Sequence, residues 1–305
     1  MALDSLIAVD WGTSNARVFR LDANGRVAER RETDQGITNV PGRDFAAALR
    51  GMAGDWIDAT PGVQVLMSGM IGSRQGWVEA PYADCPVSED ELIDKLVTTP
   101  ELDFVRIVPG VHYCSPSGRH DVIRGEEVQI FGALPEGDKG RHVFCLPGTH
   151  CKWALVENGR CTWFATAVTG EVFRALEKHT ILGALMAPAG ADTGEAGHAG
   201  FRGGLERARE DGGVLHHLFS TRADGLFSAV PAEGLRDYMS GILIGNEIRD
   251  MVAMTNATAV ILVGAPALNT RYAEALKLWG VAATPTDVDT VSVKGLTRIA
   301  KALGM

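Results

Sequence analysis

The sequence lacks several features that would place its 305 residues in common protein classes. Its five cysteines form no C-x-x-C pair, which favours reduced thiols and argues against a structural zinc site. No stretch approaches the roughly 20 apolar residues that a membrane span requires, so we expect no membrane partner. The first residues, Met1–Ser5, contain no basic segment followed by an apolar run. We therefore expect a cytoplasmic protein without a secretory signal.

Positive charge is scarce as well. The chain has 29 Lys and Arg residues against 38 Asp and Glu residues, which gives a net charge of −9 at pH 7. Binding to nucleic acid depends on clustered Lys and Arg side chains that neutralise phosphates, so this balance argues against a nucleic-acid partner. It is compatible with a small anionic substrate that a few local arginines hold.

Two common nucleotide-binding motifs are also missing. The pattern G-x-x-x-x-G-K-[ST] of P-loop proteins does not occur, and no G-x-G-x-x-G follows an expected strand. The sequence therefore argues against a P-loop protein and against a dinucleotide-dependent dehydrogenase. What is present is an ordinary globular composition, with 46% hydrophobic and 22% charged residues, at a length that suits one large or two medium domains.

The stretch from Leu6 to Leu21 is the first with functional content. Its apolar residues predict two strands joined by a tight turn of Gly12, Thr13 and Ser14, and Asp10 stands just before that turn. Backbone N–H groups and hydroxyls in such a turn suit phosphate, and a neighbouring carboxylate suits Mg²⁺ with its remaining waters. Taken alone, the stretch is also explained by an ordinary hairpin.

The same plan occurs a second time further along the chain. The apolar run Val143–Leu146 ends at the turn Pro147-Gly148-Thr149, and each of the two turns precedes a strand and an Asn-Gly pair. Internal repetition of this kind predicts a duplicated fold with two similar lobes. We place these lobes at residues 1–134 and 135–305, and we allow the final helix to pack back on the first lobe.

Other segments are interpreted from their spacing. Apolar residues at helical spacing predict helices at 44–57, 126–134, 170–185, 238–248, 269–279 and 292–303. Small residues at 187–200 predict a loop. The strand expected at 259–263 ends in Gly264 and Ala265 before a helix, an arrangement that suits the adenosine of a nucleotide.

A long loop at 67–82 follows the strand expected at 63–68. Loops after strands carry the ligand groups of many α/β proteins, and Trp77 and Tyr82 are costly side chains to leave in water. A long surface loop is the alternative to a ligand pocket here. The candidate substrate-binding residues of this loop are Ser73, Arg74, Gln75, Trp77 and Tyr82.

Taken together, these motifs resemble those of the 2-dehydro-3-deoxygalactonokinase family within the superfamily of actin-like ATPases and sugar kinases. The motifs that carry the resemblance are Asp10-Trp11-Gly12, Gly69-Met70-Ile71-Gly72-Ser73, Gly76-Trp77, Ala80-Pro81-Tyr82, Arg124-Gly125-Glu126-Glu127, Pro147-Gly148-Thr149-His150-Cys151-Lys152-Trp153 and Ser240-Gly241-Ile242-Leu243-Ile244-Gly245. The resemblance implies an α/β, two-lobed actin-like ATPase (ribonuclease H-like) fold, in which a duplicated mixed sheet is flanked by helices around a central cleft.

The resemblance also implies a reaction. The expected activity is ATP-dependent phosphorylation of 2-dehydro-3-deoxy-D-galactonate to its 6-phosphate in D-galactonate catabolism, by a phosphotransferase with an alcohol as acceptor. The expected cofactors are ATP and Mg²⁺, with Asp10 toward the metal ion. The residues expected to bind the nucleotide are Gly12, Thr13, Ser14, Gly148 and Thr149 at its phosphates and Gly264 and Ala265 at its adenosine.

The general base and the arginine that binds the substrate carboxylate are assigned with alternatives. The wider sugar kinases carry an acidic base on the helix before the second phosphate motif, and this order selects Glu126, with Glu127 as the alternative. A fork-shaped donor suits the carboxylate, so Arg74 and Arg124 are the candidates. Arg17 or Lys152 could instead neutralise phosphate.

Other functions are weighed against this one. A kinase of the same fold could act on another sugar acid or hexose derivative, and a non-kinase ATPase of the same fold could act as a chaperone or filament protein. The chain is short for the inserts or assembly faces that the latter proteins need. The epimer preference and the oligomeric state stay open at this point, with a homodimer as one option.

Overall fold

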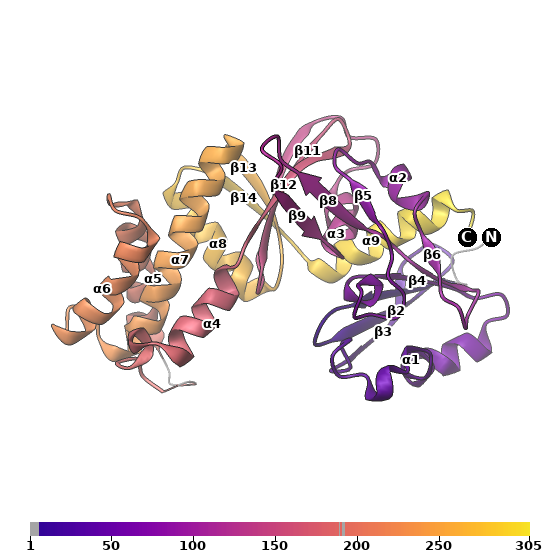
Figure 1. Ribbon diagram of the computed structural model, residues 1–305, viewed down its shortest axis with the longest axis horizontal. Coiled ribbons are helices and arrows are strands. Elements are labelled where there is room, and N and C mark those ends of the chain that lie inside the picture. The colour runs from indigo at the N-terminus through magenta and orange to yellow at the C-terminus, as the bar shows by residue number, and fades with distance from the viewer. Residues whose placement is uncertain (1–5, 189, 191–192) are drawn as a thin grey trace. The chain divides into compact units, whose positions relative to one another are not determined.

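The computed structural model describes residues 6–188, 190 and 193–305 (Figure 1). The expected absence of a secretory signal concerns Met1–Ser5 and lies outside the described residues. The chain divides into two compact units. Unit 1 comprises residues 1–141, 154–164 and 286–305, and unit 2 comprises residues 142–153 and 165–285.

Unit 1 is built on a six-stranded mixed sheet with the strand order β3-β2-β1-β4-β7-β6. Its strands are β1 (Leu6–Trp11), β2 (Ala16–Leu21), β3 (Val27–Thr33), β4 (Gln64–Ser68), β6 (Val97–Thr98) and β7 (Val105–Ile107). Strand β1 pairs antiparallel with β2 and parallel with β4, so both hairpins expected from the opening stretch are confirmed by the meander β1-β2-β3.

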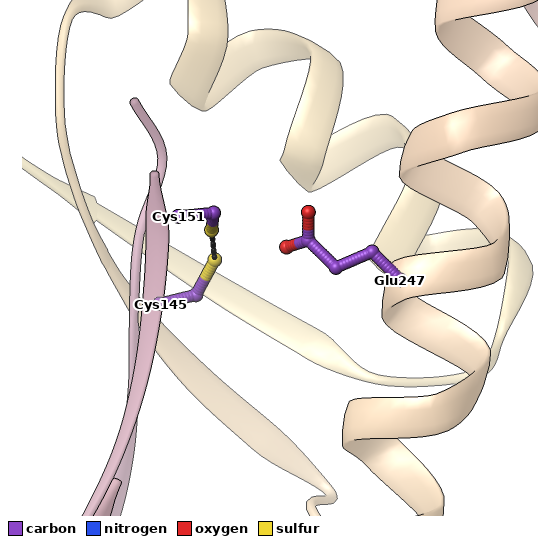
Figure 2. Close-up of side chains that lie close together, drawn as sticks. All are labelled: Cys145, Cys151 and Glu247. Atoms are coloured by element: carbon purple, nitrogen blue, oxygen red, sulfur yellow. Dashed lines mark hydrogen bonds between the residues drawn. The ribbon is translucent and has the colours of Figure 1, made fainter. Parts of the chain in front are cut away.

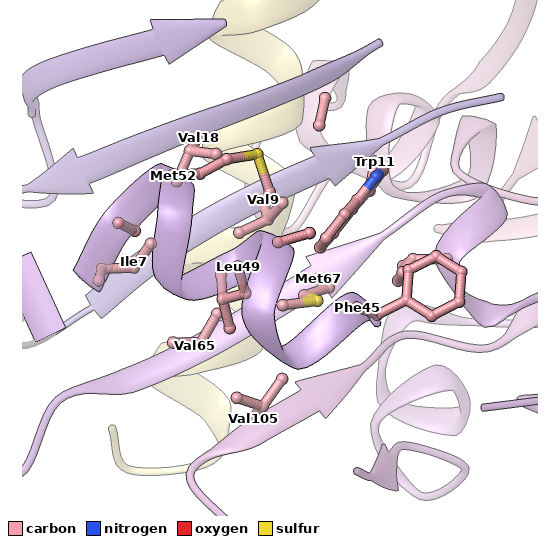
Figure 3. Close-up of a cluster of buried hydrophobic side chains, with 14 of the residues drawn as sticks. Ile7, Val9, Trp11, Val18, Phe45, Leu49, Met52, Val65, Met67 and Val105 are labelled. Atoms are coloured by element: carbon pink, nitrogen blue, oxygen red, sulfur yellow. The ribbon is translucent and has the colours of Figure 1, made fainter. Parts of the chain in front are cut away.

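Strand β1 is buried on both faces, which explains its continuous apolar sequence. Ile7, Val9 and Trp11 point to one face and pack against helix α1 (Phe45–Ala59), as Figure 3 shows. Leu6 and Ala8 point to the other face, where the core includes residues of α3 (Glu126–Ala133) and α9 (Val288–Ala302). The last helix of the chain thus belongs to unit 1.

A smaller sheet completes unit 1. It has the order β5-β8-β9, with β5 (Tyr82–Asp84), β8 (Gly110–Cys114) and β9 (His120–Ile123), and the short helix α2 (Glu89–Ile93) follows β5 in the chain. Strand β9 leads directly into α3, and β5 directly follows the predicted ligand loop. The small sheet therefore connects two segments that the sequence assigned to the substrate.

A second sheet repeats this strand plan; its residues 141, 154–164 and 286 belong to unit 1 and the rest to unit 2. It has the order β12-β11-β10-β13-β14, which matches β3-β2-β1-β4-β7 position by position. The strands are β10 (Arg141–Leu146), β11 (Cys151–Glu157), β12 (Arg160–Ala167), β13 (Ala259–Val263) and β14 (Ala282–Thr286), and β10 pairs parallel with β13 as β1 does with β4. The predicted duplication of a mixed sheet is confirmed.

The described helices of unit 2 are α4 (Thr169–His179), α5 (Gly194–Arg209), α6 (Val214–Leu226), α7 (Ala232–Thr255) and α8 (Pro266–Leu278). The loop predicted at 187–200 is wrong in its last part, because α5 begins at Gly194; positions 189, 191 and 192 of that segment lie outside the described residues. Among the helices that the structure describes, none combines the length and apolarity needed to cross a membrane.

Glycines explain why α5 reads as a loop and yet folds as a helix. Helix α5 crosses α7 so closely that a Cβ added to Gly204 would overlap the carbonyl oxygen of Tyr238, and one added to Gly241 would overlap that of Phe201. The helical cost of each glycine, about 1 kcal/mol relative to alanine, is offset here by backbone contact between the two helices.

A pair of neighbouring glycines tests this explanation. We expect Gly204→Ala to lower the free energy of unfolding by about 1–3 kcal/mol, because the helices must separate to admit the methyl group. Gly203→Ala is the matched control: its Cβ would meet the Tyr238 ring at an ordinary 3.4 Å, so the gain in helix propensity should raise stability slightly. Urea unfolding measures both, and equal destabilisation by the two variants would contradict the close-packing argument.

Candidate active site

The turn after β1 presents free backbone donors beside a carboxylate. Gly12 N–H donates to Asn15, while the carbonyl groups of Gly12, Thr13 and Ser14 accept from the segment 36–38. The N–H groups of Thr13 and Ser14 donate to no other described residue, and both residues are exposed. The turn is therefore held from behind through its carbonyl groups and keeps two donors for an anion.

Asp10 lies at the end of β1 and is 8% exposed. Its Oδ2 atom is buried without a hydrogen bond, and Arg17 Nη2 stands 3.5 Å from it. Burial raises the pKa of Asp10; Arg17 lowers it, and the negative charges of Glu126 and Asp289 raise it again. A buried carboxylate oxygen that accepts no hydrogen bond, with two further acidic groups near it, is an arrangement that favours a cation.

Asp289 was not singled out in the sequence. It lies in the first turn of α9 and accepts from Arg17 Nη1 at 2.6 Å and from Arg30 Nε at 2.7 Å. In the sequence, Asp289 is an acidic residue near the start of a helix, which is a common arrangement. It reaches Arg17 because α9, at the end of the chain, packs in unit 1. Arg17 is thereby held between two carboxylates.

Two glycines bring the start of α3 close to Asp10. A Cβ on Gly69, which has φ +95°, would lie 2.8 Å from the Trp11 carbonyl oxygen and 3.4 Å from Asp10 Oδ1. A Cβ on Gly125, with φ +103°, would lie 3.0 Å from the Cα atom of Gly69. Three backbone segments therefore meet where side chains would not fit, and the acidic start of α3 is carried to the end of β1.

The two adjacent glutamates of α3 have different surroundings. Glu127 is 1% exposed, and both its carboxylate oxygens accept from Gly125 N–H, at 2.8 and 2.7 Å. Burial, and next the charge of Glu126, raise the pKa of Glu127 to about 8. Glu126 is half-buried and accepts from Arg124 N–H at 2.9 Å, so it is the glutamate of the pair that stays open to solvent.

Arg124 is a buried cation with unused donors. It is 8% exposed, and only its Nη2 atom has a partner, the Ala80 carbonyl oxygen at 2.8 Å. Nε and Nη1 are buried without a hydrogen bond among the described residues, and the same holds for the hydroxyl of Ser73. The Arg124 guanidinium carbon lies 4.4 Å from the centre of the Tyr82 ring. The structure thus brings Ser73, Tyr82 and Arg124 into one region of unit 1.

The other predicted residues of this loop lie apart from Arg124. Arg74 is exposed, with 81% of its side chain accessible and Glu79 at 3.4 Å, and Gln75 is exposed as well. Trp77 donates to Glu101 at 2.8 Å and stacks on Phe45, which in turn contacts Trp11. Its surroundings are those of a packed core residue.

The second predicted phosphate turn lies in unit 2, between β10 and β11. Gly148, Thr149 and His150 donate no backbone hydrogen bond to a described residue, while the Thr149 carbonyl accepts from Glu171 N–H at 3.0 Å. Arg174, which sequence reasoning missed, donates to the Thr149 hydroxyl at 2.9 Å. Helix α4 thus adds a guanidinium to this turn. Arg174 stands 25 residues after Thr149 in the chain, and the sequence gives no sign of their contact.

A cavity of about 270 Å³ adjoins this turn in unit 2. Its lining residues are Gly148, Thr169, Gly170, Phe173, Arg236, Asp237, Ser240, Leu243, Ile244, Leu268, Arg271 and Tyr272. Gly264 lies at the turn itself, since a Cβ there would come within 3.3 Å of Pro147. Ala265 is the N-cap of α8, whose residues Leu268 and Tyr272 reach the cavity. Among the residues that line the cavity, the sequence assigned only Gly148 to the nucleotide. Ser240, Leu243 and Ile244 belong to the motif Ser240–Gly245, which was noted without a binding role.

Comparison with known proteins identifies the family of the chain. The model of the 2-keto-3-deoxy-galactonokinase family matches residues 10–299. The chain belongs to this family. The resemblance inferred from the sequence motifs is confirmed, and the two units with their repeated sheets form the expected actin-like ATPase fold.

Relatives of the galactonokinase family align along nearly their whole length. The chain is 37% identical to DgoK1 of Rhizobium meliloti (strain 1021), named as a 2-dehydro-3-deoxygalactonokinase, over 97% of this chain and 96% of the relative. It is 34% identical to the 2-dehydro-3-deoxygalactonokinase of Escherichia coli (strain K12), over 97% and 98% of the two chains.

Solved structures agree with this assignment. A crystal structure from Sinorhizobium meliloti that carries the same enzyme name has a TM-score of 0.90 at 36% identity and covers 98% of this chain and 99% of its own. The activator of 2-hydroxyisocaproyl-CoA dehydratase from Clostridium difficile, solved with bound ADPNP, has a TM-score of 0.52 at 14% identity, over 98% and 96% of the two chains. The latter similarity concerns the fold alone.

The raised pKa of Glu127 predicts a pH dependence of stability. Between about pH 4.5 and pH 8 the folded chain holds a proton on Glu127 that the unfolded chain has released, so the free energy of unfolding falls as pH rises through this window. Glu127→Gln cannot ionise and should lack this contribution. Thermal unfolding from about pH 5 to pH 9 should therefore show the wild type losing stability relative to the variant. Parallel curves for the two proteins would contradict the assigned pKa.

Proposed function

We propose that this chain transfers the γ-phosphoryl group of ATP to the 6-hydroxyl of 2-dehydro-3-deoxy-D-galactonate, as a step of D-galactonate catabolism. The observation that carries the proposal is the meeting of Asp10 with the start of α3, in a chain whose residues 10–299 match a galactonokinase family. Phosphoryl transfer depends mainly on positioning and on neutralising charge, and the described residues supply both.

The residues around Asp10 fit a Mg²⁺ ion. The buried Oδ2 atom of Asp10, which accepts no hydrogen bond, would hold the ion, directly or through water, with Glu126 and Asp289 adding negative charge nearby. When bound, Mg²⁺ neutralises charge on the β- and γ-phosphates. Arg17 already contacts Asp10 and is held by Asp289, so the Arg17 guanidinium is placed to balance the remaining negative charge.

Backbone donors and the cavity of unit 2 would hold the nucleotide. In this proposal Gly12, Thr13 and Ser14 bind phosphate oxygens in unit 1, and Gly148 and Thr149 do so in unit 2. Free N–H groups at both turns support the roles. The adenosine occupies the cavity beside Gly264 and Ala265, whose apolar wall includes Phe173, Leu243 and Ile244.

Glu126 would act as the general base. Its half-buried carboxylate accepts the proton of the 6-hydroxyl while that oxygen forms its bond to the γ-phosphorus, and the bond from the γ-phosphorus to the β,γ-bridging oxygen breaks to release ADP. Its openness to solvent and its position near Asp10 support this role. Glu127 is closed off by Gly125 and holds its own proton at neutral pH, which disfavours it as the base.

Arg124 would bind the substrate carboxylate. Its Nε and Nη1 atoms are buried donors without a hydrogen bond among the described residues, and a charge-assisted bond from either of them to the carboxylate would restore the missing interaction. Ser73 adds an unpartnered hydroxyl and Tyr82 a stacking surface. Arg74 and Gln75 are exposed and Trp77 packs on Phe45, so this proposal gives these three predicted residues no contact with the substrate. Homodimer formation and a cytoplasmic location remain predictions of the sequence.

A coupled assay tests the activity and the base together. The wild type should form ADP and a sugar-acid phosphate only when both ATP and 2-dehydro-3-deoxygalactonate are present. Glu126→Gln should lose about 10²–10⁴-fold in kcat, because the hydroxyl loses its proton acceptor, while ADP still binds.

Three results would redirect this assignment. ATP hydrolysis that is unaffected by the sugar acid would point to a non-kinase ATPase of the same fold. Transfer to a different sugar acid or hexose derivative, but not to this one, would change the substrate. Near-normal turnover by Glu126→Gln would move the role of base to Glu127 or Asp121.

The carboxylate assignment has its own test. Arg124→Met should raise the KM for the sugar acid by about 10- to 100-fold, since a hydrogen bond to a charged group contributes about 1.5–3 kcal/mol. The KM for ATP should stay within roughly twofold. Arg74→Met, at the exposed tip of the same loop, is the control and should leave both constants nearly unchanged. A larger effect of Arg74→Met than of Arg124→Met would reverse the assignment.

A further inference from the structure

A buried carboxylate in unit 2 has no role in the reaction described above. Glu247 lies in the middle of α7, is 7% exposed, and forms no ion pair with any described Lys, Arg or His. Its Oε1 accepts from Trp153 Nε1 at 2.8 Å, and its Oε2 accepts from the hydroxyls of Tyr272, at 2.9 Å, and Thr169. A carboxylate buried without a cation is costly unless hydrogen bonds compensate it. The loss of any one of these three donors should therefore weaken the network.

A metal site is the first alternative to consider. The ligand atoms of Glu247, Cys145 and Cys151 lie within 4.8 Å of one another, and Figure 2 shows the carboxylate directed toward the two thiols. However, the carboxylate oxygens already accept three hydrogen bonds, and burial raises the pKa of Cys145 to about 11 and holds the pKa of Cys151 well above its usual range. Metal binding requires thiolates, which this environment disfavours. The group is better explained as a hydrogen-bonded cluster.

The donors to Glu247 connect it to the nucleotide cavity. Thr169 and Tyr272 both line the cavity, although they come from α4 and α8. Thr169 is the first residue of α4. The next residue, Gly170, packs directly against the phosphate turn, because a Cβ there would lie 2.6 Å from the Gly148 carbonyl oxygen. Trp153 extends the network to β11, the strand that follows this turn. One carboxylate therefore ties together the elements that surround the cavity.

We propose that Glu247 is a positioning residue for nucleotide binding, which fixes Thr169 and Tyr272 so that the first turn of α4 stays against the Gly148–Thr149 turn. This inference rests on the proposed nucleotide site in unit 2. It assigns no contact with substrate or ATP to Glu247 itself, because its oxygens are occupied by the three donors.

Glu247→Gln is the first test variant. The amide keeps the size of the side chain but offers only one oxygen acceptor and adds a donor, so at least one of the three donors loses its partner. We expect the dissociation constant for ADP, measured by titration calorimetry, to rise about tenfold. The KM for ATP should rise in parallel, and the KM for the sugar acid should stay within roughly twofold.

A hydroxyl pair at position 169 tests the connection to the cavity. Thr169→Val removes only the hydroxyl that donates to Oε2 and should weaken ADP binding as Glu247→Gln does, whereas Thr169→Ser should restore near-normal binding. The double variant Glu247→Gln with Thr169→Val should be no weaker than roughly the worse single variant, because both remove the same interaction.

Asn246→Ala is the control for general loss of stability. Asn246 is the buried neighbour of Glu247 on α7, but its side chain donates to Ile242 and contacts His217 on α6, outside the cavity lining. We expect it to lower the unfolding temperature while leaving the ADP dissociation constant unchanged.

The outcomes separate this inference from the kinase assignment. Normal ADP binding by Glu247→Gln, or equal weakening by Glu247→Gln and Asn246→Ala at the same loss of stability, would overturn the positioning role. Stoichiometric zinc that survives dialysis in the wild type and is lost with Cys145→Ser would also overturn it, in favour of a metal site. A wild type that binds ADP but does not phosphorylate the sugar acid would refute the proposed reaction, and the ADP measurements would still decide the role of Glu247.

Discussion

Both units are built around a central strand that is buried on both faces. In each unit a tight turn follows the end of this strand. In unit 1 this strand is β1 and in unit 2 it is β10, and each is paired in parallel with a strand from later in the sequence. Because both faces of the strand are buried, its end is the place where polar groups can appear without disturbing the core. Asp10 and the free donors of both turns lie at these two ends.

The buried ionisable side chains of the two units differ in how their polar atoms are compensated. Glu247 is satisfied internally by three donors, and Glu127 is satisfied by Gly125 and by keeping its proton. Asp10 and Arg124 each keep buried polar atoms without a partner. Internal compensation is what a structural group requires, whereas a buried polar atom without a hydrogen bond is costly. In the proposed function a ligand supplies the missing interaction at Asp10 and at Arg124.

Much of the fold was predictable because its signals are local. The duplication was visible in the two Gly-Thr turns and the two Asn-Gly pairs, and the strand orders match as that repetition predicts. The start of α5 was not predictable from composition, because the small residues up to Gly200 indicate a loop until α7 is known to pack against Gly197 and Gly200. Its tertiary contacts override its local propensity.

The candidate site was predictable only where motif and position coincide. Residues of the two turns stand in sequence next to the strands that place them, while Asp289, Arg174 and Tyr272 reach the sites from helices far along the chain. A single sequence offers no sign of such pairings. Loop 67–82 illustrates the limit: its polar and aromatic content indicated a pocket, yet Trp77 packs on Phe45 while Arg124, outside the loop, contacts Tyr82.

The division between Glu126 and Glu127 shows how one helix start can serve two purposes. Adjacent residues of a helix lie about 100° apart around its axis, so one carboxyl of the pair turns inward when the other faces outward. Gly125, at positive φ, lets the chain approach Gly69 just before the two glutamates. Burial raises the pKa of the inner carboxyl, Glu127, to about 8, while the outer one, Glu126, is half-buried and lies near Asp10. A single backbone conformation therefore presents one carboxyl beside the phosphate turn and encloses the other.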